Sequence, residues 1–115
     1  MDHQTTLGDL RQLVEEFVAE RDWHQFHSPK NLSMSLAIEA GELMEHFQWI
    51  DCDQSRLSAD DPSGRQEIAA EMADVLCYLL GMANALDLDL SQAVRNKMQV
   101  NREKYPAGEF RGRFA

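Results

Sequence analysis

Cysteine, proline and glycine are all scarce in this sequence. The 115 residues include two cysteines, three prolines and six glycines. The two cysteines, Cys52 and Cys77, are too few for the disulfide framework of a secreted domain and lack the paired spacing of a zinc site. The low glycine and proline content, with 43% hydrophobic residues, excludes collagen-like repeats and argues against disorder. We therefore expect a single folded domain over 1–115 in a reducing compartment, the cytoplasm.

Positive charge is scarce as well. Lysine and arginine number 11 against 20 aspartate and glutamate residues, so the formal net charge is −9. No nucleic-acid partner is expected, because binding a phosphate backbone requires a basic face. Residues 1–4 have neither the basic nor the apolar stretch of an export signal. The longest uncharged run, 75–86, falls short of the roughly 20 apolar residues of a membrane helix, so no membrane association is expected.

Apolar residues at steps of three and four predict an all-α protein with four helices and no strand. Three helices begin after capping signals, which are Thr6, Ser28 followed by a proline, and Asp89. Pro106 ends the last helix and the helical core, which begins at about residue 5. The predicted helices cover 7–22, 29–49, 64–86 and 90–105. The predicted connections are an aromatic loop over 23–28, a polar, turn-rich segment over 51–63, and an ordered arm or frayed tail over 107–115.

The second and third predicted helices each carry two acids three residues apart. Glu39 and Glu42 lie on one, and Glu71 and Asp74 lie on the other. Residues at this interval share a helix face, with Cβ atoms about 5–6 Å apart. If the two helices pack antiparallel, four carboxylates converge beside the apolar stripes.

Such a cluster predicts a bound cation. Desolvating carboxylates without a counter-ion costs several kcal/mol per ion. Oxygen ligands suit a hard ion, so Mg²⁺ is the expected cofactor, with Mn²⁺ as a substitute. A di-iron bundle would need a histidine three residues after a glutamate, which neither pair has. Two other interpretations stay open: a non-enzymatic helical interaction module whose acids are solvated, and a metal-storage or metal-sensing protein.

Five longer blocks of sequence indicate a protein family. They are RDWHQFHSPKNL at 21–32, EAGEL at 39–43, FQW at 47–49, EMADVLCYL at 71–79 and KMQVNREKYP at 97–106. In this order they resemble the MazG-like all-α nucleoside triphosphate pyrophosphohydrolases, and among these the dCTP pyrophosphatases. The resemblance covers most of the chain, from the first predicted helix to Pro106.

The resemblance implies an activity and a set of catalytic residues. The reaction is Mg²⁺-dependent hydrolysis of a nucleoside triphosphate, dCTP or a modified dCTP, to the monophosphate and pyrophosphate, as house-cleaning of the nucleotide pool. The same chemistry on dUTP, dATP or a broad set of triphosphates is the alternative. By position, Glu39, Glu42, Glu71 and Asp74 are the expected catalytic metal ligands, and Glu39 the expected residue that orients or deprotonates the attacking water.

The resemblance also implies a substrate-binding set and an assembly. It implies a four-helix bundle that forms a homo-oligomer, a dimer at least and by expectation a tetramer, with sites completed across a subunit interface. Val14 departs from the animal dCTP enzymes, which have a histidine near the base at this position. Aromatic side chains can stack on the base, and residues of the last helix align with family residues that bind phosphate and sugar. The expected substrate-binding residues are Trp23, His27, Lys30, Asn31, Trp49, Tyr78, Lys97, Asn101, Lys104 and Tyr105.

Overall fold

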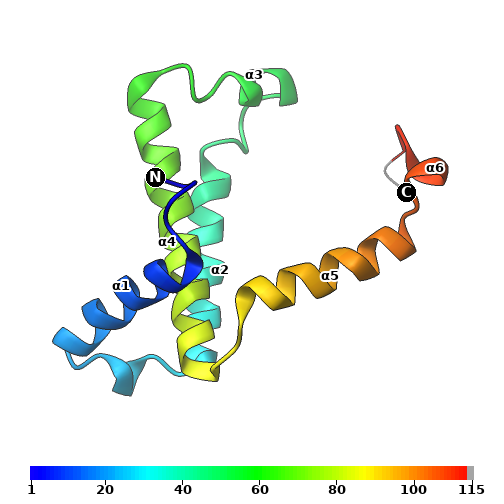
Figure 1. The fold of residues 1–115 in the computed structure, drawn as a ribbon. Helices are drawn as coiled ribbons and strands as arrows, with labels where there is room; N and C mark the ends of the chain where they lie inside the picture. The colour runs from blue at the N-terminus through cyan, green and yellow to red at the C-terminus, as the bar shows by residue number, and fades with distance from the viewer. Residues whose placement is uncertain (114–115) are drawn as a thin grey trace.

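The computed structural model describes residues 1–113, and none of them forms a strand. The predicted all-α class is therefore confirmed. Four long helices account for most of the chain, and three short helical turns lie between or after them (Figure 1). The elements are α1 (Leu7–Glu20), η1 (His24–Phe26), α2 (Pro29–Glu45), α3 (Cys52–Arg56), α4 (Pro62–Leu86), α5 (Leu90–Lys104) and α6 (Ala107–Phe110).

The predicted capping signals form real caps. The Thr6 hydroxyl accepts a hydrogen bond from the backbone N–H of Asp9 at 3.0 Å, and the Asp9 carboxylate accepts one in return from the backbone N–H of Thr6. The Ser28 hydroxyl caps α2 through the N–H of Asn31 at 3.2 Å. Each contact satisfies an N–H that a helix start would otherwise leave unpaired.

Several boundaries differ from the sequence-based expectation, as do the three short helices, of which η1 lies within the predicted aromatic loop. Helix α2 ends at Glu45 and not near residue 49, because its last turn tightens: the N–H of His46 bonds to the carbonyl of Leu43. Helix α4 starts at Pro62, because Asp61 is its N-cap. Helix α3 was expected to be irregular chain. The predicted tail contains α6, and residues 114–115 lie outside the described part of the chain.

Helices α2 and α4 form the centre of the fold. They run antiparallel side by side, and α1 packs across α4 (Figure 1). Among residues 1–113, four apolar side chains are buried at these contacts: Val18, Leu32, Leu80 and Ala83. This core is small for the length of the chain, but it lies where it fixes the separation of α2 and α4.

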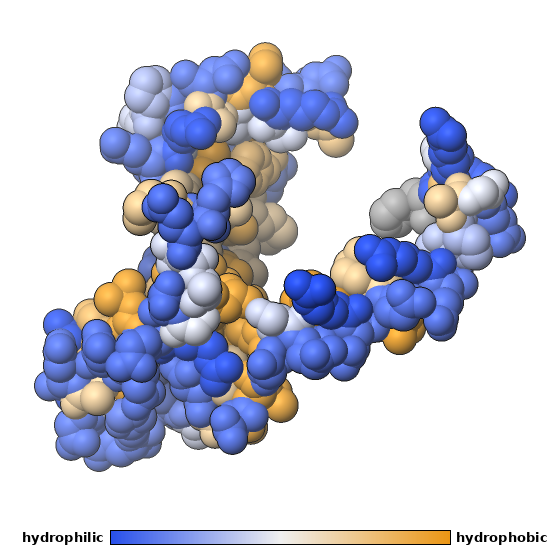
Figure 2. Space-filling view, in the orientation of Figure 1, coloured by the Kyte–Doolittle hydropathy of each residue, from blue (hydrophilic) through white to orange (hydrophobic). Residues whose placement is uncertain are grey.

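Helix α5 extends away from the other three long helices. It packs only weakly on the body of the chain, which leaves the apolar side chains of both exposed (Figures 1 and 2). The radius of gyration is 17.1 Å, against about 13 Å for a compact domain of this length. The accessible surface is 9254 Å², against about 6,400 Å² expected for a folded monomer of this mass. The excess is the size of a protein–protein interface.

Helix α4 is notable for its hydropathy. By length and composition alone it could cross a membrane, with a mean hydropathy of 1.3 over its most apolar window. The expectation of no membrane helix was based on the shorter uncharged run, whereas this window tolerates two charged residues. The core helix of a water-soluble protein meets the same criterion, and most of α4 is exposed in the single chain.

One arginine ties α1 to the end of α4. The Arg11 guanidinium donates to the side chain of Asn84 at 2.9 Å and to the carbonyls of Ala83 and Leu88 at 3.1 and 2.8 Å. The Asn84 amide returns a hydrogen bond to the Arg11 carbonyl at 3.1 Å. A positive charge at a helix C-terminus also compensates the helix dipole. The contact therefore sets how α1 crosses α4.

We expect Arg11→Ala to lower the free energy of unfolding by about 2 kcal/mol, because it removes three hydrogen bonds from a charged donor at a partly buried junction. Urea denaturation at fixed protein concentration measures this loss. Arg56→Ala is the matched control, since its ion pair with Asp53 is exposed and worth less than about 1 kcal/mol. An equal decrease in the free energy of unfolding of the two variants would contradict the structural role of Arg11 at the junction of α1 and α4.

Candidate functional site

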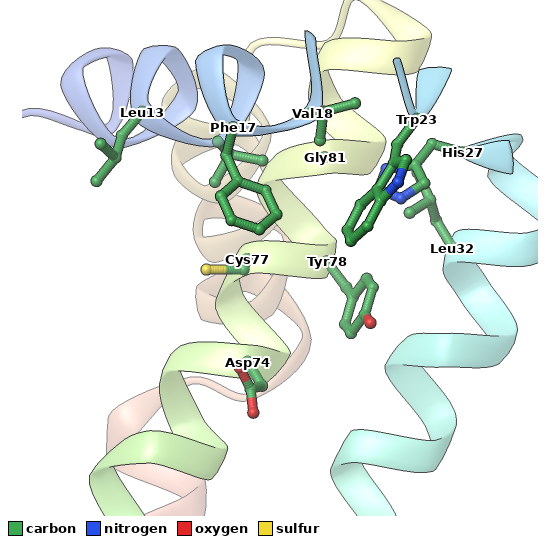
Figure 3. Close-up of a pocket in the computed structure, with 11 residues that line it drawn as sticks. Leu13, Phe17, Val18, Trp23, His27, Leu32, Asp74, Cys77, Tyr78 and Gly81 are labelled. Atoms are coloured by element: carbon green, nitrogen blue, oxygen red, sulfur yellow. The ribbon is translucent and has the colours of Figure 1, made fainter. Parts of the chain in front are cut away.

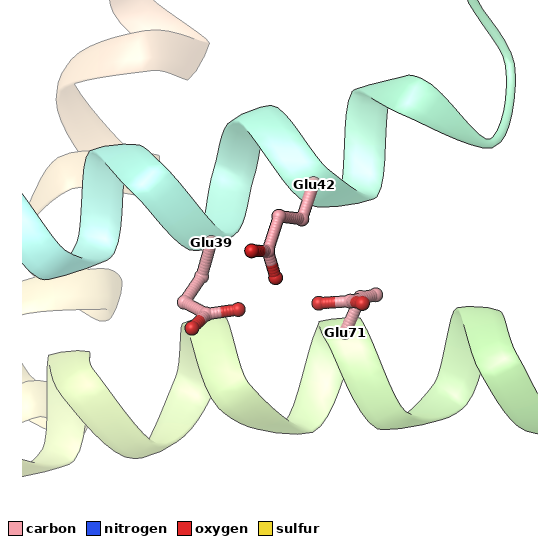
Figure 4. A group of neighbouring side chains, drawn as sticks. All are labelled: Glu39, Glu42 and Glu71. Atoms are coloured by element: carbon pink, nitrogen blue, oxygen red, sulfur yellow. The ribbon is translucent and has the colours of Figure 1, made fainter.

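Three of the four predicted acidic ligands meet between α2 and α4. Glu39 and Glu42 point from α2 toward Glu71 on α4, and one carboxylate oxygen of each lies within 4.8 Å of the others (Figure 4). The antiparallel contact of the two helices produces this meeting, as the spacing predicted. Glu39 and Glu71 are half-buried, whereas Glu42 is exposed, so the acidic cluster (Glu39, Glu42 and Glu71) opens to solvent on one side.

The acidic cluster is electrostatically unfavourable as it stands. The Oε2 atoms of Glu39 and Glu71 are buried and have no hydrogen-bond partner. The pKa of Glu39 is raised from its ordinary value of 4.5 to about 7. The causes are, first, a hydrogen bond with Glu42, then burial, then the charges of Glu42 and Asp74, and last a hydrogen bond with Glu71. Close carboxylates thus favour a shared proton, or a cation, among them.

The donor set fits a hard divalent cation. It consists of carboxylate oxygens only, two of them buried without a partner, and Mg²⁺ and Mn²⁺ prefer such ligands. Histidine and cysteine, the usual zinc ligands, do not contribute to the acidic cluster within the described residues.

An apolar cavity of about 380 Å³ lies next to the acidic cluster, between α1, α4 and the aromatic segment that follows α1 (Figure 3). Asp74 belongs to this cavity and not to the group of three, although its charge still raises the pKa of Glu39. The fourth predicted acid therefore connects the two parts of the site. The lining residues are Leu13, Val14, Phe17, Val18, Trp23, His27, Leu32, Asp74, Cys77, Tyr78 and Gly81.

Aromatic rings form the walls of the cavity. Trp23 and Tyr78 stand on one side and Phe17 on the other (Figure 3). Phe17 and Trp23 pack edge to face with ring centroids 5.6 Å apart, and the guanidinium of Arg21 covers Phe17 at 3.7 Å. Three predicted base-binding residues, Trp23, His27 and Tyr78, are thus brought together here.

Cys77 lines the same cavity but is not an activated thiol. Burial raises the pKa of Cys77, and the neighbouring Asp74 charge raises it further. Because the thiolate is the nucleophilic form, a raised pKa keeps this side chain unreactive near neutral pH.

Three other predicted residues lie away from the cavity walls. Trp49 follows α2 and is 87% exposed. The Asn31 amide donates to the carbonyl of Phe26 at 3.0 Å, so it holds the end of the aromatic segment. Lys30 is exposed in the first turn of α2. Within one chain these three side chains do not line the cavity.

The predicted phosphate and sugar residues all lie on or directly after α5. Lys97, Asn101 and Lys104 follow one another along one side of the helix, as their spacing predicted. Tyr105 caps α5, with Phe110 edge to face at 5.3 Å. Because α5 extends away from α2 and α4, one chain does not bring these residues to the acidic cluster (Figure 1).

Sequence reasoning missed the contribution of α1. The apolar stripe of α1 is largely exposed within one chain, with Leu13 63% and Phe17 47% exposed. Val18 alone of the stripe is buried within the described chain. The others line or border the cavity. The apolar stripe itself was the signal that this helix contributes to a site. Periodicity shows that a helix face is apolar, but it does not show what lies against that face.

The raised pKa of Glu39 predicts how the stability of the metal-free protein depends on pH. Its carboxyl group binds a proton more tightly when folded, so the folded state is favoured at low pH, and this advantage is lost as pH rises from 4.5 through about 7. We expect the melting temperature in EDTA to fall between pH 5.5 and 8.5, and Glu39→Gln to flatten this fall. A pH profile that Glu39→Gln leaves unchanged would contradict the geometry.

Comparisons with known proteins agree with this geometry. The sequence profile of the MazG-like family matches residues 34–113. The chain is 46% identical over 109 residues to dCTP pyrophosphatase 1 of Mus musculus, and 45% identical over 104 residues to that of Homo sapiens. These alignments cover 95% and 90% of this chain, but it spans only 64% and 61% of those relatives' length.

A solved structure shares the fold. It is a pyrophosphatase from Archaeoglobus fulgidus, with 36% sequence identity and a TM-score of 0.82, and the match covers 90% of this chain and 95% of that one. The predicted fold type is thereby confirmed, and the chain belongs to the MazG-like family.

Proposed function

We propose that this protein hydrolyses a deoxynucleoside triphosphate, dCTP or a modified dCTP, to the monophosphate and pyrophosphate in a Mg²⁺-dependent reaction. The observation that carries the proposal is the acidic cluster, with its two unpartnered buried oxygens, beside an aromatic cavity. A triphosphate nucleotide has the matching halves, an anionic chain and a flat base. The names of the similar proteins, dCTP pyrophosphatase 1 and pyrophosphatase, support the same chemistry.

The acids divide into two roles in this proposal. Glu42, Glu71 and Asp74 would hold the Mg²⁺, and Glu39 would either join them as a ligand or act on the attacking water. A bound ion would neutralise the negative charge that develops on the phosphate oxygens as the phosphoanhydride bond breaks. Glu39, which faces Glu42 and Glu71 in the acidic cluster, is the group that would orient the attacking water and accept its proton.

The cavity takes the base. Trp23 and Tyr78 supply aromatic faces for stacking, and His27 supplies a ring nitrogen for the base edge. Val14 also lines the cavity, where the animal enzymes have a histidine. Because most of the lining residues are apolar, few groups can read the donor and acceptor pattern of a base. This observation favours the alternative of a broader set of triphosphates, dUTP and dATP included, over strict selection of cytosine.

A second copy of the chain completes the site. Helix α5 carries Val94, Met98 and Tyr105 on the same side as Lys97 and Asn101, and the apolar ones are about half exposed. Residues 90–115 carry a net charge of +4, whereas 1–89 carry −13. Helix α5 of one copy therefore complements the acidic body of another and brings Lys97, Asn101 and Lys104 to the triphosphate. The excess accessible surface suits a dimer at least, and a tetramer if α4 is also covered.

Turnover of a nucleotide panel with and without Mg²⁺ tests the chemistry. We expect pyrophosphate and the monophosphate as products, with Mg²⁺ required and Mn²⁺ able to replace it. Glu71→Gln should lower kcat by more than about 100-fold, because it removes one charged ligand of the metal ion. Glu45→Gln is the matched control: Glu45 is exposed on α2 outside the acidic cluster, and its variant should keep full activity.

A different outcome would favour a non-enzymatic helical module. In that case Mg²⁺ would not raise the melting temperature, Glu42→Gln would leave it unchanged or higher, and no triphosphate would be hydrolysed.

Subunit complementation tests the shared site. Glu71→Gln and Lys97→Ala should each be inactive alone, since one lacks a metal ligand and the other a phosphate contact. After mixed unfolding and refolding in equal amounts, hybrids contain one intact site, so about a quarter of wild-type activity should return. If the mixture stays inactive while forming hybrid oligomers, Lys97 acts within its own chain or not at all.

A further inference from the structure

The aromatic segment that forms one wall of the cavity, residues 22–27, has little packing of its own. None of the residues of η1 is buried. The segment begins at Asp22 with a φ of 52°, a left-handed conformation that is uncommon for residues other than glycine and that aspartate tolerates better than most. Its position must therefore come from contacts with neighbouring elements.

Hydrogen bonds hold the segment near both of its ends. The N–H of Trp23 donates to the carbonyl of Val18 at 3.0 Å, and Phe26 accepts from the Asn31 side chain at 3.0 Å. Between these points, His24 and Glu15 join the turn to α1, with His24 Nε2 and Glu15 Oε1 2.7 Å apart. Because a carboxylate can only accept, the histidine Nε2 carries the proton and donates.

The side of the turn that faces away from the main cavity borders a second cavity. This cavity, of about 140 Å³, is lined by both members of this pair. It shares Val14, Val18, His27 and Gly81 with the main cavity, so His27 stands between the two. This second cavity is partly open, so few protein atoms back the turn on that side. On this side the His24–Glu15 contact joins the turn to α1, whereas on the side of the main cavity Trp23 packs against Phe17.

From this geometry we infer that His24 and Glu15 are positioning residues for the base: their contact holds the turn that presents Trp23 and His27, without touching the substrate. The inference depends on the proposed nucleotide function for its kinetic consequence. It concerns affinity, since the phosphate-binding and acidic groups lie on other elements. Both side chains are about half exposed, so their replacement should leave the fold intact.

Kinetics of four variants provide the first test. We expect His24→Ala and Glu15→Ala each to raise KM for the nucleotide by about threefold to fivefold, the range of a partly exposed ion pair, with kcat within twofold of wild type. The double variant should raise KM no further than either single variant does, because both substitutions break the same contact. His24→Gln, which keeps a donor of similar reach, should restore KM. Arg56→Ala, which breaks an equally short exposed ion pair on α3, should change nothing.

Tryptophan fluorescence keeps the inference separate from the proposed function. The chain has two tryptophans, so Trp49→Phe leaves Trp23 as the reporter. In this background His24→Ala should increase quenching of Trp23 by iodide, even if no triphosphate is hydrolysed. Unchanged quenching would overturn the inference. So would a rise in KM of the double variant that is the product of the two single effects, or a fall in kcat without a rise in KM. Increased quenching without any nucleotide turnover would leave the positioning role standing and refute the proposed function.

Discussion

The mutual repulsion of the carboxylates between α2 and α4 is the constraint on which the site depends. Glu39, Glu42 and Glu71 face one another, and two of their oxygens are buried without a partner. The small core around Leu32 and Leu80 holds the two helices together against this repulsion. A divalent cation bound among these carboxylates would relieve their repulsion and contact the unpartnered oxygens.

The site has two halves with opposite physical character. The acidic cluster is polar and partly open, whereas the cavity beside it is walled by aromatic and aliphatic side chains. Asp74 borders both, because it lies one helical turn beyond Glu71 on α4. A ligand with a flat apolar end and a polyanionic end would span them, provided that a divalent cation lies between the carboxylates and the polyanionic end.

The distribution of charge resolves an apparent conflict. A protein with a net charge of −9 repels anions at long range, yet the proposed substrate is strongly anionic. The positive charge is concentrated on α5 and the residues after it, which one chain leaves far from its own acidic cluster. Under the proposed function a neighbouring subunit would bring that positive charge to the triphosphate, and assembly would then be part of the chemistry.

By itself the sequence determined the elements and the acidic face. Periodic apolar residues, the caps at Thr6, Ser28 and Asp89, and the paired acids are local features, and local features follow from hydrogen bonding and helical spacing within a few residues. It did not reveal α3, although Asp51 and Gln54 form a capping box there. That signal is short and lacks an apolar stripe.

Only the tertiary structure decided what the faces of the helices contact. It put Asp74 on the cavity and not within the group of three acids, exposed Phe17 as a wall, left Trp49 in solvent, and carried α5 away from the body. These outcomes depend on crossing angles and on surfaces distant in sequence, such as the Arg11 contact with the end of α4. Periodicity tells which side of a helix is apolar, but the partner of that side is a property of the packed molecule and its neighbours.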